Sequence, residues 1–329
     1  RINVEFDWYR RNNFDLIGLV QTMGVGGATT KWANDATMES TGCEFTISTT
    51  NIKTKDFKWT TDWIFSWGEN KITKLDSRAQ VYQLVAGSIM GRVEELPVGA
   101  LFSIPFAGLT EEGLPTFYVD KDHTQIAGPG SYDLVNFQEF YDNVDYLKYE
   151  GTVDPTIMGS FGNTFSWKGL KLNVFFTYSF GNVLRLDPLC YVYGSQYSDL
   201  TASMKEMKNR WVVPGDEQRT TIPAIATVRQ MGEINDLTNA YSAYNYSTER
   251  VAKGDFIRLK ELSLSYDLPK KLFEGQKAVS SFSVKLSATN IWLAYADKKL
   301  NGRDPEYYNS GGVSSPVPRQ FTLTVKLGF

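Results

Sequence analysis

The sequence predicts an all-β protein, and more specifically an antiparallel transmembrane β-barrel. About ten segments alternate apolar and polar side chains with the period of a β-strand. Their apolar sides are rich in aromatic residues, which make up 14% of the chain. The connections between the segments alternate between short and long. Outer-membrane barrels combine these features, because one side of each strand meets lipid and the turns and loops lie at opposite ends.

The first three predicted strands, residues 1–9, 43–49 and 57–67, alternate clearly. Two later segments are less regular. Residues 80–90 are apolar on both sides, and residues 100–106 contain Pro105, which weakens strand pairing. The apolar positions of the first three strands are Ile2, Val4, Phe6, Trp8, Cys43, Phe45, Ile47, Phe57, Trp59, Trp63, Phe65 and Trp67.

The clearest hairpin runs from Phe161 to Phe180 through a turn at Lys168 and Gly169. Residues 256–268 form the next predicted strand, with a change of phase near Glu261 that indicates a β-bulge. Residues 282–288 and the final stretch FTLTVKLGF complete the set. We expect the following residues to face lipid: Trp59, Trp63, Phe65, Trp167, Phe176, Phe282, Leu323, Val325 and Leu327.

The predicted connections differ in length at the two ends of the strands. Those of one set are short, and those of the other set are long, with residues 68–79 of moderate length. A soluble β-sandwich or jelly roll also alternates with period two and is the main structural alternative. It gives no reason for all long connections to lie at one end. The short set is 51–55, 91–98, 168–169 and 269–279, and the long set is 10–41, 107–157, 181–253 and 291–318.

Composition excludes several classes of protein. The net charge of −3 argues against a nucleic-acid partner, because phosphate binding needs clustered Lys and Arg. No run of about 18 apolar residues exists, so a membrane-spanning helix is excluded. A mean hydropathy of −0.30 is compatible with a barrel, whose alternating faces average out. Cys43 and Cys190 lack metal-binding spacing and are expected to be isolated thiols, with a disulfide as the alternative.

Seven stretches in order along the chain resemble the C-terminal half of the SusC/RagA family of TonB-dependent outer-membrane transporters of Bacteroidetes. They are TGCEFTISTTNIKTKDFKWTTDWIFSWGENKITKL, GLTEEGLPTFYVD, YEGTVDPTIMGSFGNTFSWKGLKLNVFFTYSFGN, RWVVPGDEQRTTIPAI, GDFIRLKELSLSYDLPKKL, ATNIWLAYADKKLNGRDPE and FTLTVKLGF. The resemblance implies a barrel of 22 strands containing an N-terminal plug, in the outer membrane of a Gram-negative bacterium. Residues 1–329 would be the C-terminal part of that single barrel domain. The plug, the TonB-contacting segment and about twelve strands would lie outside this chain.

The resemblance also implies partners and roles. A SusD-like surface lipoprotein would cap the barrel, and Phe329 would be the terminal aromatic read during barrel insertion. The outer strands of the fragment, residues 1–9 and 321–329, should pair with strands of the N-terminal half, because an unpaired edge in lipid costs several kcal/mol per group. We therefore expect TonB-dependent import of oligosaccharides, or of oligopeptides. A passive porin and a soluble glycan-binding β-sandwich are the alternatives.

No enzyme motif is present, and the protein is not expected to be an enzyme. The single histidine, His123, lies in a predicted loop and is expected to be a surface residue. We expect no cofactor. Asp-Pro pairs at Asp154, Asp187 and Asp304 favour turns, although oxygens near Asp304, Asp297 and Asn301 could hold calcium.

Aromatic residues in the long connections are candidates for contact with the substrate or with the lipoprotein lid. Tyr and Trp are favoured at interfaces, and sugar rings stack on the same side chains, so the sequence does not separate the two roles. Packing of the loops on each other is the alternative interpretation. Residues 201–211 have a short helical pattern. The candidates are Tyr191, Tyr193, Tyr197, Trp211, Tyr241, Tyr244, Trp292 and Tyr295.

Overall fold

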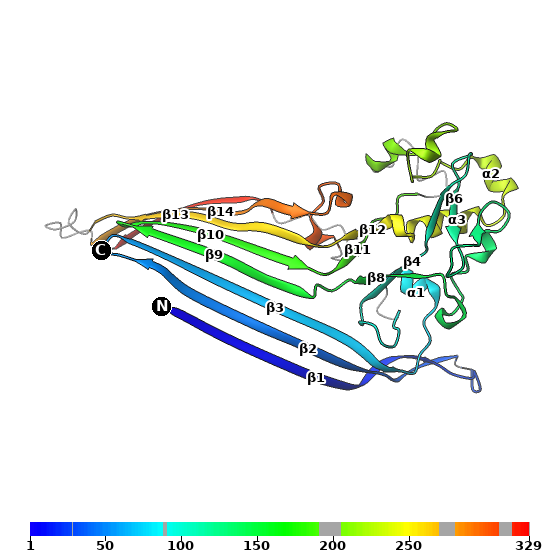
Figure 1. Cartoon of the computed structure of the whole chain (residues 1–329), viewed down its shortest axis with the longest axis horizontal. Coiled ribbons are helices and arrows are strands. Elements are labelled where there is room, and N and C mark those ends of the chain that lie inside the picture. Colours follow the sequence, from blue (N-terminus) through cyan, green and yellow to red (C-terminus); the bar gives the residue numbers. More distant parts are fainter. Residues whose placement is uncertain (28, 88–90, 191–204, 270–279, 309–317, 329) are drawn as a thin grey trace.

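Eight long strands form one antiparallel sheet in which each strand pairs with the next one along the chain (Figure 1). The structure is a computed structural model that describes residues 1–27, 29–87, 91–190, 205–269, 280–308 and 318–328. The strands of the sheet are β1 (Ile2–Gln21), β2 (Thr30–Lys53), β3 (Phe57–Leu75), β9 (Ile157–Trp167), β10 (Leu170–Phe180), β13 (Phe256–Asp267), β14 (Ser281–Ala296) and β15 (Gln320–Gly328).

The predicted hairpin and bulge are confirmed. Trp167 of β9 pairs with Leu170 of β10, and the two turn residues between them, Lys168 and Gly169, have φ of 46° and 90°. Positive φ at both turn positions is typical of the type I′ turn, whose twist matches that of the flanking strands. In β13 the register with β14 shifts between Leu259 and Glu261, so the change of phase in the sequence marks a real bulge.

Two of the about ten predicted strands are not part of the sheet. Residues 81–85 form the helix α1 (Val81–Val85), whose start is fixed by a capping box between Gln80 and Gln83. Residues 100–109 form two short strands, β4 (Ala100–Ser103) and β5 (Phe106–Leu109), interrupted at Pro105. The predicted long loop at 10–41 is also wrong, because β1 and β2 continue through most of it as a paired hairpin.

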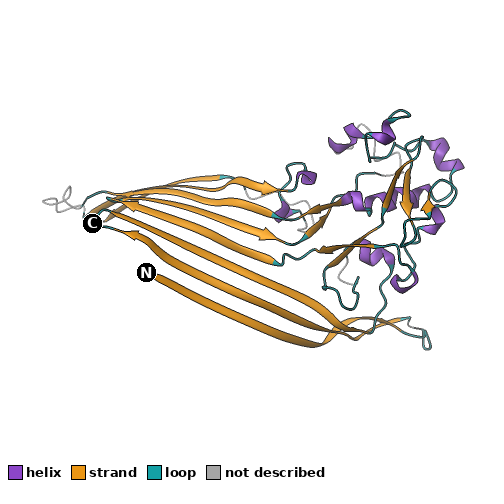
Figure 2. Cartoon of the chain, viewed as in Figure 1, coloured by secondary structure: helices purple, strands orange, loops and turns teal. Residues whose placement is uncertain are grey.

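The difference between the two ends of the sheet is confirmed. The connections at the end that carries both termini are 54–56, 168–169 and 268–280, whereas those at the far end are 22–29, 76–156, 181–255 and 297–319. The segment 91–98 is not one of the short turns, since it belongs to the far end. Figure 2 shows that the helices gather at that far end, together with short strands and loops, whereas the long strands lie side by side over the remaining length.

The described parts of the connections 76–156 and 181–255 fold together into one body at the far end of the sheet, here called the head. Its core is built from aromatic and aliphatic side chains of both connections, including Leu84, Phe102, Phe117 and Tyr241. Its strands beyond β4 and β5 are β6 (Pro115–Tyr118), β7 (Ile126–Ala127), β8 (Lys148–Thr152), β11 (Val183–Arg185) and β12 (Val251–Lys253). Its helices beyond α1, within the described residues, are η1 (Tyr132–Leu134), η2 (Tyr141–Asn143), η4 (Lys205–Asn209), η5 (Asp216–Gln218), α2 (Val228–Glu233), α3 (Leu237–Asn245) and η6 (Thr248–Arg250).

The final long connection carries two further turns of 3₁₀ helix, η8 (Lys298–Leu300) and η9 (Pro305–Tyr307). Leu300 packs with Leu184 and Ala252, so this connection adheres to β11 and β12. The eight long strands follow one another in sequence order across a single sheet, which is the arrangement of a barrel wall and not of the two packed sheets of a β-sandwich. In the described ranges, no helix combines the length and apolar character needed to cross a membrane.

Gly159 of β9 lies where a side chain of the neighbouring strand β10 approaches the backbone closely. The Tyr178 hydroxyl of β10 lies over Gly159 of β9 and donates to the carbonyl of Ile64 at 3.0 Å. A Cβ at Gly159 would lie 2.2 Å from that carbonyl and 2.4 Å from the Tyr178 hydroxyl. We expect Gly159→Ala to cost about 1–3 kcal/mol of barrel stability, measured by urea unfolding in lipid vesicles.

Gly162→Ala in the same strand is the matched control. The added Cβ there would lie 3.2 Å from the ring of Phe175, so the required shift is smaller. Equal losses in the two variants would show that the packing of Tyr178 over Gly159 is not the cause.

Candidate functional site

One continuous apolar face crosses the whole sheet. Paired residues project to the same side of a sheet, and the pairing joins six strands in one apolar row. All nine predicted lipid-facing residues lie on this face, and Trp167 and Leu323 are 55% and 66% exposed. Their contact with lipid stays a prediction. The row consists of Trp59, Phe165, Leu172, Leu264, Leu286 and Leu323.

Polar atoms on the apolar face are hydrogen-bonded to each other. The side-chain oxygen of Asn163 accepts from Trp59 Nε1 at 2.9 Å and from the Thr61 hydroxyl at 2.8 Å. Trp63 Nε1 donates to the Tyr178 hydroxyl at 2.9 Å. Because lipid offers no hydrogen bonds, such internal pairing is what a lipid-facing surface requires.

Two of the predicted contact residues lie in the core of the head. Tyr241 and Tyr244 in α3 are each 1% exposed, and the Tyr241 hydroxyl donates to the carbonyl of Ala224 at 2.6 Å. Burial also raises the pKa of the Tyr244 hydroxyl. Their burial contradicts the expectation that they present rings to a ligand or a lid. The alternative interpretation, loops packed on each other, is correct for this pair.

The other candidates divide into three groups. Trp211 is half-buried, with Nε1 donating to Glu217 at 3.2 Å. Trp292 and Tyr295 lie in β14, where they pair with Leu259 and Ile257, so their placement in a loop is wrong. Both share the apolar face near the head, where aromatic residues mark the membrane interface in barrels. Tyr191, Tyr193, Tyr197 and the insertion residue Phe329 lie outside the described residues.

Buried arginines connect the parts of the head. Arg185 donates to the carbonyls of Phe102 and Ser247 at 2.5 and 2.9 Å. Burial lowers the pKa of Arg185 to about 10, so it remains charged at neutral pH. Arg250 pairs with Glu206 at 2.6 Å. Together these two residues tie β4, β11, η4 and η6 into one unit.

The carboxylates near Asp304 have protein partners. Asp304 accepts from the guanidinium of Arg258 and from the backbone N–H of Glu306 at 3.1 Å. Glu306 also pairs with Arg258, at 3.3 Å. The arginine therefore supplies the positive charge that a calcium ion would bring. Within the described ranges no group of three or more His, Cys, Asp or Glu residues could hold a metal ion.

Neither cysteine is bonded to the other. Cys43 and Cys190 are free thiols, as expected, and burial raises the pKa of Cys190 to about 12. His123 has a φ of 56° and stacks on Tyr118, with ring centroids 4.5 Å apart. This single imidazole is exposed, as the sequence predicts for a surface residue.

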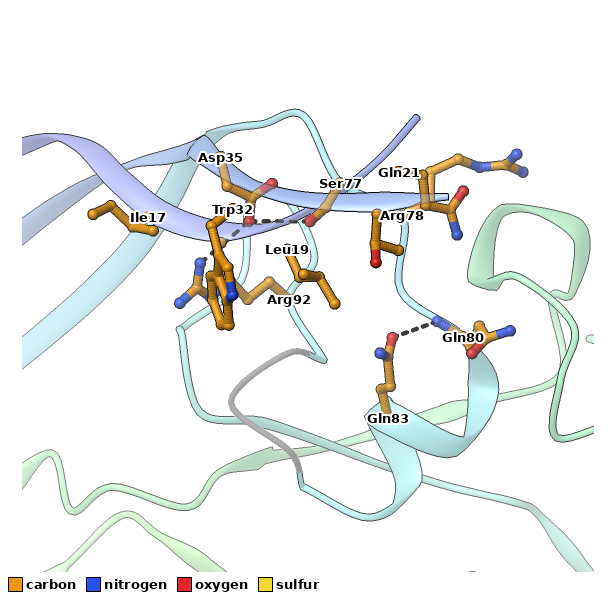
Figure 3. Close-up of a pocket in the computed structure, with 12 residues that line it drawn as sticks. Ile17, Leu19, Gln21, Trp32, Asp35, Ser77, Arg78, Gln80, Gln83 and Arg92 are labelled. Atoms are coloured by element: carbon orange, nitrogen blue, oxygen red, sulfur yellow. Dashed lines mark hydrogen bonds and ion pairs between the residues drawn. The ribbon is translucent and has the colours of Figure 1, made fainter. Parts of the chain in front are cut away.

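A cavity of about 430 Å³ lies between the head and the far end of the β1–β2 hairpin (Figure 3). The cavity was not predicted from the sequence, because residues 10–41 were expected to be a loop and residues 80–90 a strand. The alternation of Ile17, Leu19 and Gln21 could have revealed that the first strand continues. The cavity is lined by Ile17, Gly18, Leu19, Gln21, Thr30, Trp32, Asp35, Ser77, Arg78, Gln80, Gln83 and Arg92.

The chain is similar to TonB-dependent receptors over nearly its whole length. No family model matches the sequence. The chain is 36% identical to the TonB-dependent receptor SusC of Bacteroides thetaiotaomicron, over 99% of this chain and 30% of that protein. It is 25% identical to the TonB-dependent receptor P3 of Formosa agariphila, over 100% of this chain and 32% of that protein. The chain thus spans about a third of the length of these curated relatives.

Solved structures show the same fold. The RagAB peptide transporter superposes with a TM-score of 0.73 at 23% identity, covering 100% of this chain and 33% of the matched chain. The RagAB peptide importer in its closed-closed state gives a TM-score of 0.71 at 24% identity, over 100% of this chain and 34% of the matched chain. The long sheet and its head therefore adopt the fold of part of an outer-membrane transporter.

Proposed function

Because this chain belongs to the SusC/RagA family of TonB-dependent outer-membrane transporters, we propose that the whole protein imports oligomeric nutrients across the outer membrane. TonB would supply the energy through a plug inside the barrel. In this proposal the sheet of residues 1–329 is barrel wall, and the head lies at the outer end of the passage.

The main observation in support of this proposal is the continuous apolar face of the eight-stranded sheet. Such a face needs lipid or another protein to cover it, and the strands are long enough to cross the membrane. Transmembrane strands need about 9–11 residues, and the shortest strand of the sheet has 9. β2, with 24 residues, extends well beyond the apolar layer on the side of the head.

Closure of the barrel requires more strands than this chain contains. β1 pairs only with β2, and β15 only with β14, among the described strands. Each outer edge therefore presents unpaired N–H and C=O groups, which are costly in lipid. We propose that strands of the N-terminal half of the receptor pair with both edges and that the plug fills the interior.

We also propose a SusD-like lipoprotein as the partner that closes over the head. The fold shared with RagAB supports a two-component assembly, and the head lies at that end of the sheet. The substrate would be an oligosaccharide, with an oligopeptide as the alternative.

Uptake by the intact receptor tests the proposal. In cells that carry the receptor and its lipoprotein, we expect accumulation of labelled oligosaccharide to stop when TonB is deleted or the proton-motive force is collapsed. Recovery of the receptor in the outer-membrane fraction serves as the control for assembly. Uptake that continues without TonB would instead identify a passive porin and overturn the proposal.

A further inference from the structure

The cavity between the hairpin and the head has the character of a binding site rather than a packing defect. Its volume of about 430 Å³ falls within the range of about 300–1,000 Å³ of small-molecule sites. One wall comes from β1 and β2, and the other from residues 77–83 and Arg92 of the head (Figure 3). We infer that this cavity binds a neutral sugar unit of the imported molecule, an inference that rests on the proposed function.

Trp32 supplies an aromatic surface on the hairpin side. Its side chain is 67% exposed, although it lies beside a cavity and its neighbours Leu19 and Ile17 are apolar. Burial of this exposed indole under a ligand is favourable when the ligand has C–H groups on one face, as a pyranose ring has. The apolar wall therefore favours a sugar ring laid against Trp32.

Amide groups face the cavity from the other side. Gln83 Oε1 accepts from the backbone N–H of Gln80 at 2.9 Å, which fixes the side chain across the start of α1. Gln83 Nε2 has no hydrogen-bond partner among the described residues. Gln80 Nε2 donates to the carbonyl of Gln138 at 3.1 Å. A fixed amide with free donor hydrogens is suited to a hydroxyl oxygen of a ligand.

Charges in the lining are already paired. Asp35 is 3% exposed, and its Oδ2 accepts from the Ser77 hydroxyl at 3.1 Å and from Arg92 Nη1 at 3.2 Å. Arg78 pairs with Asp142 at 2.6 Å. A neutral ligand therefore fits better than a peptide with charged termini, because a charged group would find no free counter-charge.

Asp35 also leaves one acceptor unused. Its Oδ1 is buried and has no hydrogen-bond partner within the described chain, which is uncommon for a carboxylate oxygen. Gly18 makes this burial sterically feasible, since a Cβ there would lie 2.2 Å from Asp35 Oδ2. Oδ1 is enclosed by protein atoms, so the ligand contacts of the site come from Trp32 and Gln83 and not from this oxygen.

Calorimetry on the intact, detergent-solubilised receptor tests the site. The probes are short neutral oligosaccharides of glucose, mannose, galactose and xylose, with short peptides as the comparison. For the oligosaccharide that binds, we expect Trp32→Ala to raise the Kd about fivefold to tenfold. Trp32→Phe keeps an aromatic surface and should remain within about twofold of the parent.

Phe14→Ala is the matched control. Phe14 lies on the same hairpin and is 68% exposed, but it does not line the cavity. Its truncation should leave the Kd unchanged. Equal effects of Trp32→Ala and Phe14→Ala, no effect of Trp32→Ala, or binding of peptides alone would each overturn the sugar site.

Failure of this inference is distinguishable from failure of the proposed function. If Trp32→Ala retains TonB-dependent uptake and an unaltered Kd, the sugar site is refuted and the importer function stands. Uptake that is independent of TonB removes the importer, whatever the binding data show.

Discussion

Phe176→Arg should prevent most of the receptor from reaching a folded state in the outer membrane. Phe176 lies near the middle of β10, between Phe161 and Leu259 on the continuous apolar face. An arginine at mid-membrane depth on a lipid-facing position costs about 2–4 kcal/mol, and removal of the ring adds to this cost. The measurement is the folded fraction in outer-membrane extracts by heat-modifiable gel mobility, followed by urea unfolding in vesicles.

Two variants isolate the cause. Thr177→Arg places the same charge one residue further along β10, on the opposite face of the sheet. It should cost little, because that face is predicted to line the barrel interior. Phe176→Ala separates the loss of the ring from the addition of charge. If Thr177→Arg were the more damaging arginine, the assignment of the two faces would have to be reversed.

The sheet was predictable because its signals are local. Strand alternation sets the face of each side chain, and a two-residue turn fixes the register of β9 and β10. The bulge in β13 was visible as a change of phase at Glu261. These features depend on residues that are close in sequence, so no long-range information is needed to find them.

The head was not predictable in the same way, since its core joins segments far apart in the chain. Residues 81–85 are apolar on both sides because the short helix α1 is buried against β4, not because a strand is covered on both faces. Trp292 and Tyr295 were placed in a loop because β14 changes register before them. A bulge hides the continuation of a strand from any search for strict alternation.

Composition alone did not predict which aromatic residues of the connection 181–255 are buried and which are exposed. A high content of Tyr is typical both of a binding interface and of a buried core, so it does not distinguish the two. The spacing of Leu237, Ala240, Tyr241 and Tyr244 is that of one face of a helix. That spacing, applied to α3, predicts burial of the pair and would have corrected the assignment.

Tyr241→Ala should therefore unfold the head without unfolding the barrel. The side chain is fully buried against the aromatic core, and truncation of a buried large aromatic costs about 3–5 kcal/mol. Tyr241→Phe removes only the hydroxyl that donates to Ala224, and should cost about 1 kcal/mol. Hydrogen exchange resolved by peptide is the measurement, since it reports the head and the sheet separately.

Exchange should accelerate in the head of Tyr241→Ala while β9, β10 and β13 remain protected, because the ladder of the sheet does not depend on the core of the head. Val228→Ala is the surface control, since Val228 is 82% exposed on α2 and should change stability by less than about 0.5 kcal/mol. If Tyr241→Ala left the head protected but abolished substrate binding, the ring would have to reach the ligand in a rearranged head. Protection lost together with binding would instead mean that the core of the head holds the outer wall of the cavity in place.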